Sequence, residues 1–595
     1  VNDCCDEHHL CRFWTRIGEC SKNPDWMLPN CAKSCGVCRR TSIIAISRPI
    51  TVANIMRGGC ARMNLPNSCA DDICFHKHFR TFDGSCNNLD NSLRGAAFTP
   101  FVRLLPPAYD DGNNAVADSI RRERPNARLV SRALLSSRRA IASRASSMLM
   151  QFGQFLSHDM SKNKLDGHCK CDGGPECISI FLSPTDSRSR GAPCIPLKRA
   201  AAICGTGVGG VAREQMNANT AFIDASQVYG SDAISQRKFR AGFRSGLSMI
   251  PIGGRMFPPM DGRNTFNTGD DRSNLFVGLA ALHTVFVRLH NKIDTDLRHI
   301  NRHWSENRLF QETRKIVGAM MQVVTYKEFL PALLGSLHDT LIPGYIRYNP
   351  TINPGVSNEF AGAAYRLHGL IQEIYELRNR NFDVIGTTRF VESTFQVQRI
   401  ISGGIDSLIR GLVSQPARLP QRITTQVTEL LGGGMLDMAS INIMRGRDHG
   451  FPTYNHYRRL CKLPPITSFD DWPEVSEVEV RERVKELYRN PEHIDLYVGG
   501  VIEDPIEGSI LGPTFACIIA DQFIRSRDGD RFYFENPDQF TVSQIMALKR
   551  ITLSSILCET ADDLPFLPMN VFIVSNQSVV PCVSIPSLDL TPWRE

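Results

Sequence analysis

The chain has 595 residues, of which 42% are hydrophobic and 22% charged, a composition typical of globular proteins and not of disordered or collagenous ones. Its net charge of +7 is spread over many short clusters, so we predict no nucleic-acid partner. No run of about 18 apolar residues occurs, so we predict no transmembrane segment.

The cysteine content indicates an oxidising compartment. Twenty cysteines are present, and disulfides persist mainly in secreted and extracellular proteins. The chain opens with Val1-Asn2-Asp3-Cys4 and has no charged segment followed by an apolar run, so we interpret it as a mature chain without its signal peptide. One glycosylation sequon, at Asn576, agrees with a secreted glycoprotein.

Residues 1–40 are predicted to form a small disulfide module. They are too short to build a core, yet seven of them are cysteine, and spacing alone cannot choose among the possible pairings. A zinc or redox site at the CxxC formed by Cys35 and Cys38 is the less favoured alternative, because no second CxxC or histidine pair accompanies it.

The cysteines and aromatic residues of this module follow a pattern that resembles the ShKT family of small helical, toxin-like modules. The resemblance leaves Cys5 over and implies three disulfides, namely Cys4–Cys38, Cys11–Cys31 and Cys20–Cys35. Toxins of this family block potassium channels with a lysine followed by an aromatic residue, but the matching place here is Asp25-Trp26. A spacer role, or docking of another protein, is therefore the favoured interpretation.

Residues 41–68 carry no strong periodicity and are predicted to be a linker, whereas residues 69–595 show no break in composition and no internal repeat. Long helical patterns alternate with Pro/Gly loops, and β-type runs such as residues 571–574 are few and short. The predicted fold is one large, mainly α-helical domain with few short strands, preceded by the small helical module.

The segment GQFLSHDM crowds polar residues into two turns of a helix that has an apolar face. Gln154 and His158 are four residues apart and so lie on one face, whereas Asp159 points about 100° away. We expect Gln154 and His158 to face one cavity and Asp159 to face a second site. A satisfied core histidine beside a solvated aspartate is the alternative interpretation.

The segment TAFIDAS places polar groups at every second position. Thr220, Asp224, Ser226 and the Phe222 carbonyl would lie on one side of an extended or looped segment. Ca²⁺ takes about six to eight oxygen ligands, and Asp159 would add a second carboxylate. An N-cap or turn explains the segment nearly as well.

A second candidate histidine lies in the segment FAGAAYRLHGLIQ. His368 falls in an apolar helical pattern, for which a core histidine is the default interpretation. Periodicity alone does not favour it over His283, His290 or His449.

Five segments occur in an order and at spacings that resemble the animal haem peroxidases, the family of myeloperoxidase and peroxidasin. They are "GQFLSHDM", "NANTAFIDASQVYGSD", "GDDRSN…HTVFVRLHN", "FAGAAYRLHGLIQ" and "INIMRGRDHGFPTYNHYRRLC". The resemblance covers roughly residues 70–595. An ShKT module before such a domain is similar to the cuticle-associated peroxidases of nematodes.

The resemblance implies a role for five residues. His158 would be the distal histidine, which takes a proton from H₂O₂ and returns it to the departing oxygen. Arg272 would stabilise the negative charge that develops, and Gln154 would hold distal water or halide. His368 would be the proximal ligand of the haem iron, and Asn442 would accept a hydrogen bond from its other ring nitrogen.

The resemblance also implies a calcium site. Its ligands would be Asp159, Thr220, the Phe222 carbonyl, Asp224 and Ser226. Because the aspartate adjoins His158 in the sequence, bound Ca²⁺ is expected to hold the catalytic histidine in place.

The sequence departs from the family at the positions that attach haem. Most mammalian members form two ester bonds to haem from acidic residues, but the matching residues here are Ser157 and Leu275, and the position of the myeloperoxidase sulfonium link is Phe276. None of these can form the link. We therefore expect haem b to be held without covalent bonds, and we consider chloride oxidation less favoured.

The remaining cysteines are expected to form disulfides. The family pattern implies Cys74–Cys86, and the expected pairs further along are Cys461–Cys517 and Cys558–Cys582. The pairing within one cluster stays open, with a metal site as the less favoured alternative, and its members are Cys169, Cys171, Cys177 and Cys194.

The predicted function is that of a secreted haem peroxidase, which reduces H₂O₂ and oxidises phenolic or tyrosyl donors, matrix proteins included. One alternative is a non-catalytic matrix or adhesion protein on a peroxidase scaffold, which would need neither the His158–Arg272 pair nor a proximal ligand. A cyclooxygenase-type lipid oxygenase would need a tyrosine near the proximal histidine, and Tyr365 is close, but the calcium segment argues against this class.

Overall fold

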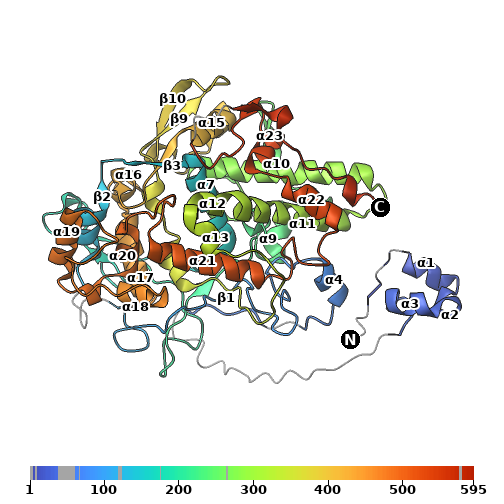
Figure 1. The fold of residues 1–595 in the computed structure, drawn as a ribbon, viewed down its shortest axis with the longest axis horizontal. Coiled ribbons are helices and arrows are strands. Elements are labelled where there is room, and N and C mark those ends of the chain that lie inside the picture. Colours follow the sequence, from blue (N-terminus) through green and yellow to red (C-terminus); the bar gives the residue numbers. More distant parts are fainter. Residues whose placement is uncertain are drawn as a thin grey trace.

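The computed structural model describes residues 5, 6, 8, 10–37, 60–65, 68–117, 124–165, 167–174, 176–262, 265–574 and 579–595. A small helical module lies beside a much larger, mainly helical body (Figure 1). The predicted fold class is therefore confirmed. No helix in these ranges is long and apolar enough to cross a membrane.

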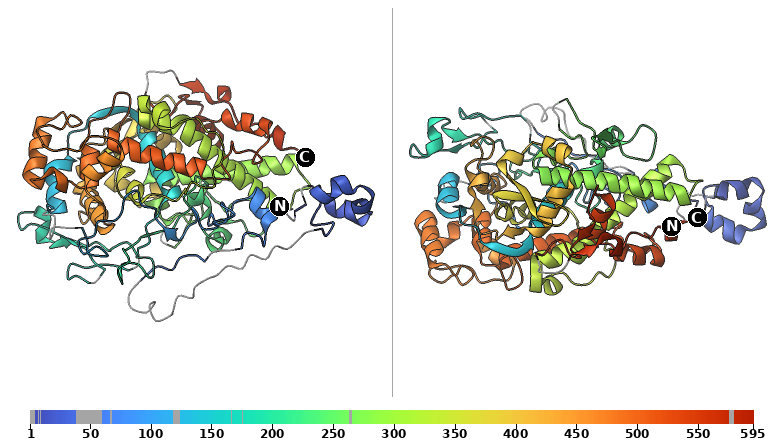
Figure 2. Two further views of the ribbon diagram at one scale, coloured as in Figure 1. Left: turned by 60° about the horizontal axis from the view of Figure 1, so that its bottom comes forward. Right: turned by 90° about the horizontal axis from the view of Figure 1, so that it is seen from above.

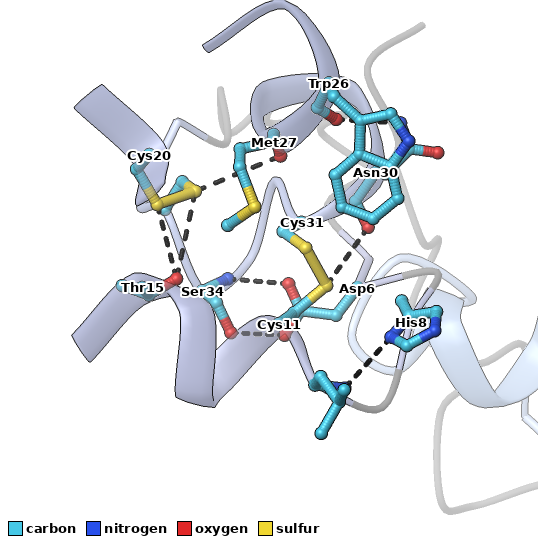
Figure 3. The surroundings of a disulfide bond; sticks show 12 residues. Asp6, His8, Cys11, Thr15, Cys20, Trp26, Met27, Asn30, Cys31 and Ser34 are labelled. Atoms are coloured by element: carbon cyan, nitrogen blue, oxygen red, sulfur yellow. Dashed lines mark hydrogen bonds between the residues drawn. A yellow bond between two sulfur atoms is a disulfide. The ribbon is translucent and has the colours of Figure 1, made fainter. Parts of the chain in front are cut away.

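Two disulfides and one buried apolar side chain hold the module together (Figure 3). Its helices are α1 (Cys11–Arg16), α2 (Glu19–Lys22) and α3 (Pro24–Asn30). Cys11–Cys31 and Cys20–Cys35 form as predicted, and Met27 is buried between them. The Asp6 carboxylate accepts hydrogen bonds from the backbone N–H and the hydroxyl of Ser34, at 2.8 and 2.6 Å. The predicted Cys4–Cys38 pair lies outside the described residues, as does Asn576.

A third disulfide joins the module to the large domain, and it corrects one prediction. Cys74, in α4 (Ile73–His78), pairs with Cys5 and not with Cys86, which pairs with Cys69. The two Cα–Cα distances, 5.2 and 5.6 Å, suit these pairings. The family pattern implied Cys74–Cys86, and it missed the Cys5–Cys74 pair because the approach of residue 5 to α4 is a tertiary contact that local sequence does not encode.

The other cysteines of the described ranges are also paired, and none of these is free. The pairs Cys461–Cys517 and Cys558–Cys582 form as predicted. The open cluster is resolved as Cys169–Cys177 and Cys171–Cys194. Cys60 pairs with Cys204, so residues at the end of the predicted linker are tied to the large domain. The domain boundaries themselves stay predictions.

Long helices form the centre of the large domain, and α10 and α11 run side by side through it (Figures 1 and 2). The central helices are α7 (Ser147–Met160), α10 (Val277–Ile300), α11 (Glu306–Val324), α17 (Met438–Asp448) and α21 (Pro513–Asp528). Shorter helices surround them: α6 (Ala127–Val130), α8 (Ser226–Tyr229), α9 (Ala233–Phe239), α12 (Leu330–Leu334), α13 (His338–Leu341), α14 (Gln398–Gly403), α15 (Asp406–Ser414), α16 (Thr425–Thr428), α18 (Tyr454–Leu460), α19 (Val478–Tyr488), α20 (Leu496–Ile502), α22 (Val542–Lys549) and α23 (Leu553–Thr560).

The strands of the described ranges form two-stranded pairs only. Six pairs are antiparallel: β1 (Thr99–Pro100) with β6 (Met216–Asn217), β3 (Ala142–Ser146) with β11 (Pro416–Arg418), β4 (Ile180–Phe181) with β5 (Cys194–Ile195), β7 (Ile250–Ile252) with β8 (Arg255–Phe257), β9 (Ile374–Arg378) with β10 (Val384–Arg389), and β13 (Phe566–Leu567) with β14 (Val580–Pro581). One pair, β2 (Ser136–Ser137) with β12 (Ile423–Thr424), is parallel. Residues 571–574 form no strand, since Ile573 makes only an isolated bridge to Ala145.

Helix α7 is buried on almost every side, so its polar side chains need partners inside the protein. Phe155 stacks on Phe286 of α10 with ring centroids 4.9 Å apart, and Phe152 packs on Phe572 at 5.3 Å. Asp159, near the end of the helix, has no exposed surface. A buried carboxylate needs hydrogen bonds or a cation, so the interpretation of a solvated aspartate is wrong.

The segment around His368 is not the helix that its apolar pattern suggested. Residues Phe360–Ala364 form a short π-helix (η7), His368–Leu370 form a single 3₁₀ turn (η8), and β9 follows. Gly369 lies against the backbone of Pro420, where a Cβ atom would come within 2.1 Å of the carbonyl oxygen. The apolar spacing arises because the loop is buried, and burial does not distinguish a turn from a helix.

Candidate active site

The residues predicted for catalysis meet at one cavity of about 310 Å³. Helix α7 contributes Gln154 and His158, the 3₁₀ turn η4 (Asp271–Asn274) contributes Arg272, and η8 contributes His368. These side chains come from three segments of the chain and converge among apolar side chains of α7, α12 and the loop before η8. Concave, mostly apolar sites with a few convergent polar groups are typical of cofactor pockets.

His158 is held as a neutral imidazole. Burial and the Arg272 cation keep its pKa well below the usual range. Its Nδ1 atom is fully buried without a hydrogen-bond partner, while the ring lines the cavity. The backbone carbonyl of His158 accepts hydrogen bonds from Asn219 Nδ2 at 2.5 Å and from Arg272 Nη2 at 3.4 Å. Gln154, one turn earlier, accepts from Gln151 Nε2 at 3.1 Å.

His368 and Asn442 are in contact as predicted, but with the opposite polarity. The amide nitrogen of Asn442, on α17, lies 2.9 Å from His368 Nδ1 and donates to it. Its amide oxygen accepts instead from Arg366 Nη1 at 3.3 Å. The prediction that this oxygen accepts the ring N–H is therefore wrong for this structure, because the Arg366 guanidinium takes the oxygen. Burial and Arg366 lower the pKa of His368 to about 3, so the imidazole is neutral.

Two cavity residues were not among the predicted site residues, although Tyr365 was considered for the lipid oxygenase alternative. Arg366 is a half-buried cation that donates to the Ala361 carbonyl at 2.8 Å, and desolvation lowers its pKa to about 10. No carboxylate in the described ranges forms an ion pair with it, so the site favours an anionic group of a ligand. Tyr365 has a buried hydroxyl without a partner, and its ring stacks on Phe360 at 4.6 Å. Both residues lie within three positions of His368 in the sequence, and this was the signal that could have identified them as cavity residues.

Ser157 and Leu275, which the family resemblance matches to the ester-forming acids, line the cavity as well. None of the described residues that line the cavity is Asp or Glu. Phe276 is buried, with its ring 4.8 Å from that of Tyr375 and 5.2 Å from that of Phe390. The described cavity wall therefore offers no carboxylate for a covalent bond to a ligand.

The residues predicted to bind calcium also meet, on the side of α7 away from the cavity. Asp159 Oδ1 accepts from the backbone N–H and the hydroxyl of Ser226, at 2.6 and 2.9 Å. Thr220 Oγ1 donates to Asp224 Oδ2 at 3.1 Å. Between these residues Phe222 is buried, with the Arg80 guanidinium 4.4 Å from its ring centre. The segment is a bent loop, not an extended strand.

Two carboxylates share this buried loop, and their electrostatics favour a cation. Burial and the Asp224 carboxylate raise the pKa of Asp159 well above its usual range. A divalent cation between them would remove that repulsion. The described ranges contain no group of three or more His, Cys, Asp and Glu residues placed to hold a metal, so hydroxyl and carbonyl oxygens would have to complete the shell, as Ca²⁺ allows.

Comparison with protein families gives two matches. The animal haem peroxidase family matches residues 79–572, and the ShK domain-like family matches residues 3–38. Peroxidase skpo-1 of Caenorhabditis elegans is 47% identical, with 100% of this chain and 97% of that protein covered. Peroxidase mlt-7 of the same organism is 36% identical, with 100% and 94% covered. Peroxidasin of Drosophila melanogaster is 39% identical, with 90% and 39% covered.

Solved structures agree with this assignment. Peroxidase A from Dictyostelium discoideum superposes with a TM-score of 0.74 at 28% identity and covers 83% of this chain and 99% of its own. A fatty acid alpha-dioxygenase of Oryza sativa, at 19% identity and a TM-score of 0.71 over 88% of this chain and 90% of its own, shares the fold. With the two-histidine cavity and the five ordered segments, these matches show that the chain belongs to the animal haem peroxidase family and is a peroxidase, with haem as the family's cofactor.

Proposed function

We propose that this peroxidase reduces H₂O₂ with His158 and Arg272 and binds the haem iron through His368. The observation that carries the assignment is the cavity that all three side chains line. The residues present fit a haem, because the cavity joins an uncoordinated imidazole to the uncompensated Arg366 cation, which suits a propionate group. Haem, when bound, supplies the iron at which the peroxide O–O bond is broken.

Neutral His158 is ready to act as a base. It would take the first proton of H₂O₂ and return it to the departing oxygen as a general acid, since burial favours the uncharged ring. Arg272 keeps a fixed positive charge for the oxygen that becomes negative. Gln154 would position water or peroxide beside them. On the other ring, Asn442 would orient His368. Iron binding through Nε2 leaves the ring proton on Nδ1, so the Asn442 amide would turn its oxygen towards Nδ1 when haem binds.

Haem b would be held without covalent bonds. Ser157 and Leu275 replace the acids that form esters in relatives, and the described cavity wall has no other carboxylate. Without such links, phenolic and tyrosyl donors, matrix proteins included, become the favoured substrates and halides the less favoured ones.

Calcium would bind in the loop of Asp159, Thr220, Phe222, Asp224 and Ser226. The raised pKa of Asp159 and the buried, converging oxygens support this proposal. The cation would hold the end of α7, and with it His158.

Secretion and a docking role of the module complete the proposal. Every cysteine of the described ranges is in a disulfide, which agrees with an oxidising compartment. The module exposes Phe13 and Trp26, at 56% and 40% of their surface, and such side chains suit contact with another protein.

The test compares two histidine variants with a surface control. His368→Ala should lose haem and the Soret band, whereas His158→Ala should keep both and react with H₂O₂ at least about 100-fold more slowly. His303→Ala, half exposed on the surface, should match the wild type. Wild-type protein that carries haem but stays inert towards H₂O₂ and guaiacol would refute the proposal.

A further inference from the structure

We propose that Asp270 is a positioning residue of the distal site, where a single carboxylate orients both Arg272 and His158. The inference rests on the roles proposed above for those two residues. Asp270 lies two residues before Arg272 and is not among the predicted site residues. Only 2% of its surface is exposed.

Asp270 holds Arg272 through two hydrogen bonds. Asp270 Oδ1 accepts from Arg272 Nε at 2.8 Å and Oδ2 accepts from Nη2 at 2.7 Å. This two-point contact between a planar guanidinium and a carboxylate fixes distance and plane together. Arg272 is part of the cavity wall and a quarter of its side chain is exposed, so without this contact its long side chain would have other rotamers available.

His158 lies beside the same carboxylate. Its Nδ1 atom lies 3.9 Å from Asp270 Oδ1 and has no other partner in the described ranges. That separation is too long for a hydrogen bond, so the carboxylate acts through its charge. A proton on Nδ1 points at the anion, whereas a proton on Nε2 would leave a lone pair facing it. The geometry therefore favours the tautomer that keeps Nε2 free to accept a proton from peroxide.

Asp270 Oδ1 accepts a hydrogen bond from Arg272 and is also the atom that lies near His158 Nδ1, so a change in this carboxylate affects both side chains. Asp270 also caps η4, where its Oδ1 accepts from the backbone N–H of Arg272 at 2.8 Å. Asn and Ser are good caps as well, so uncharged variants can keep the turn and remove the charge. The capping role and the positioning role can thus be separated.

The experiment uses the haem-loaded full-length protein and four single variants. Asp270→Asn and Asp270→Ser should keep haem content and the Soret band, but lower the rate constant for H₂O₂ and for cyanide binding about 100-fold. The KM for guaiacol should change less than about twofold, because Asp270 is proposed to act in the step with H₂O₂ and not in the binding of the donor. The matched control is Asp271→Asn, which removes the neighbouring charge; its carboxylate is 76% exposed and pairs with Lys162. The fourth variant, His158→Gln, tests the proposed function separately, and a chain that carries both His158→Gln and Arg272→Gln is the background for a double-mutant cycle.

In a chain that carries both His158→Gln and Arg272→Gln, the further change Asp270→Asn should alter the rate less than about threefold. The proposal is overturned if both uncharged variants react within threefold of the wild type, or if the loss is the same in the double background. It is also overturned if the lost activity equals the lost haem. If His158→Gln alone leaves the peroxide rate unchanged, the proposed function fails instead.

Discussion

His158 and Asp159 are neighbours on α7, yet they contact different sites. The His158 ring lines the cavity, while the Asp159 carboxylate accepts the backbone N–H of Ser226 at 2.6 Å on the far side of the helix. Because successive helix residues point about 100° apart, one turn of α7 contributes both to the candidate active-site cavity and to the loop proposed to bind calcium. A change in that loop should therefore reach His158, the proposed catalytic histidine, through only one peptide bond.

Removal of calcium should destabilise the protein and slow its reaction with peroxide. With Ca²⁺ at about 100 times its Kd, binding adds about 2.7 kcal/mol to the free energy of unfolding. Chelation should lower the Tm of the wild type, and added Ca²⁺ should restore it. Asp159→Asn should show the low Tm with or without Ca²⁺, whereas Asp296→Asn, half exposed on α10, should behave as the wild type. A Tm that is insensitive to chelation in the wild type would contradict the site.

Acid-acetone extraction should release unmodified haem b. Ser157 and Leu275 provide no carboxylate, and none of the other described lining residues does. The measurement is the absorbance of the organic phase compared with that of the precipitated protein. A relative that carries both ester links is the control and should keep its haem with the polypeptide. Retention of haem by this protein would show a covalent bond elsewhere.

Tyr365→Phe should leave peroxidase activity within about twofold of the wild type and stabilise the fold slightly. The Tyr365 hydroxyl is buried without a partner, and an unsatisfied buried hydroxyl costs about 1–3 kcal/mol. In the control, Tyr229→Phe, His290 Nδ1 loses its 2.9 Å partner, and stability should fall by about 1 kcal/mol. Guaiacol turnover and urea unfolding measure the two effects. Abolition of guaiacol turnover by Tyr365→Phe would contradict the prediction and show that the hydroxyl takes part in the peroxidase reaction.

Stability should fall between about pH 4.5 and pH 7 because of Glu328. Burial raises the pKa of this carboxyl to about 7, so in that window the unfolded chain has lost a proton that the folded protein still holds. The free energy of unfolding falls by about 3 kcal/mol once the pH exceeds the pKa of Glu328 in both the unfolded and the folded chain.

Urea unfolding at several pH values checks this prediction. Glu328→Gln, which can still accept the Leu553 N–H that lies 2.7 Å from Oε2, should flatten the dependence. Glu306→Gln is the control: hydrogen bonds from Arg298 lower the pKa of Glu306 to about 2, so its contribution is lost only at lower pH. Its effect should therefore be constant from pH 5 to 8. Equal slopes in wild type and Glu328→Gln would refute the prediction.

The sequence by itself determined the local chemistry of this protein. The four-residue spacing of Gln154 and His158 placed both on one helix face, and the TAFIDAS segment identified a loop that meets Asp159. The helical module and two of its disulfides followed from the ShKT pattern. The shared helix face depends on short-range geometry, which helix periodicity determines. The disulfide pairs were implied only by the family resemblance, because spacing alone could not choose among the possible pairings.

Only the tertiary structure decided how distant segments complete the sites. The contact of Asp270 with both Arg272 and His158 depends on η4 packing against α7, although Arg272 and His158 are 114 residues apart in the sequence. The polarity of Asn442 toward His368, 74 residues away, is set by competition from Arg366. Cys5 finds Cys74 across 69 residues, which spacing could not anticipate. In each case the deciding partner is brought near by tertiary packing of segments that lie far apart in the sequence, and apolar burial is too unspecific in sequence to say which polar groups it will bring together.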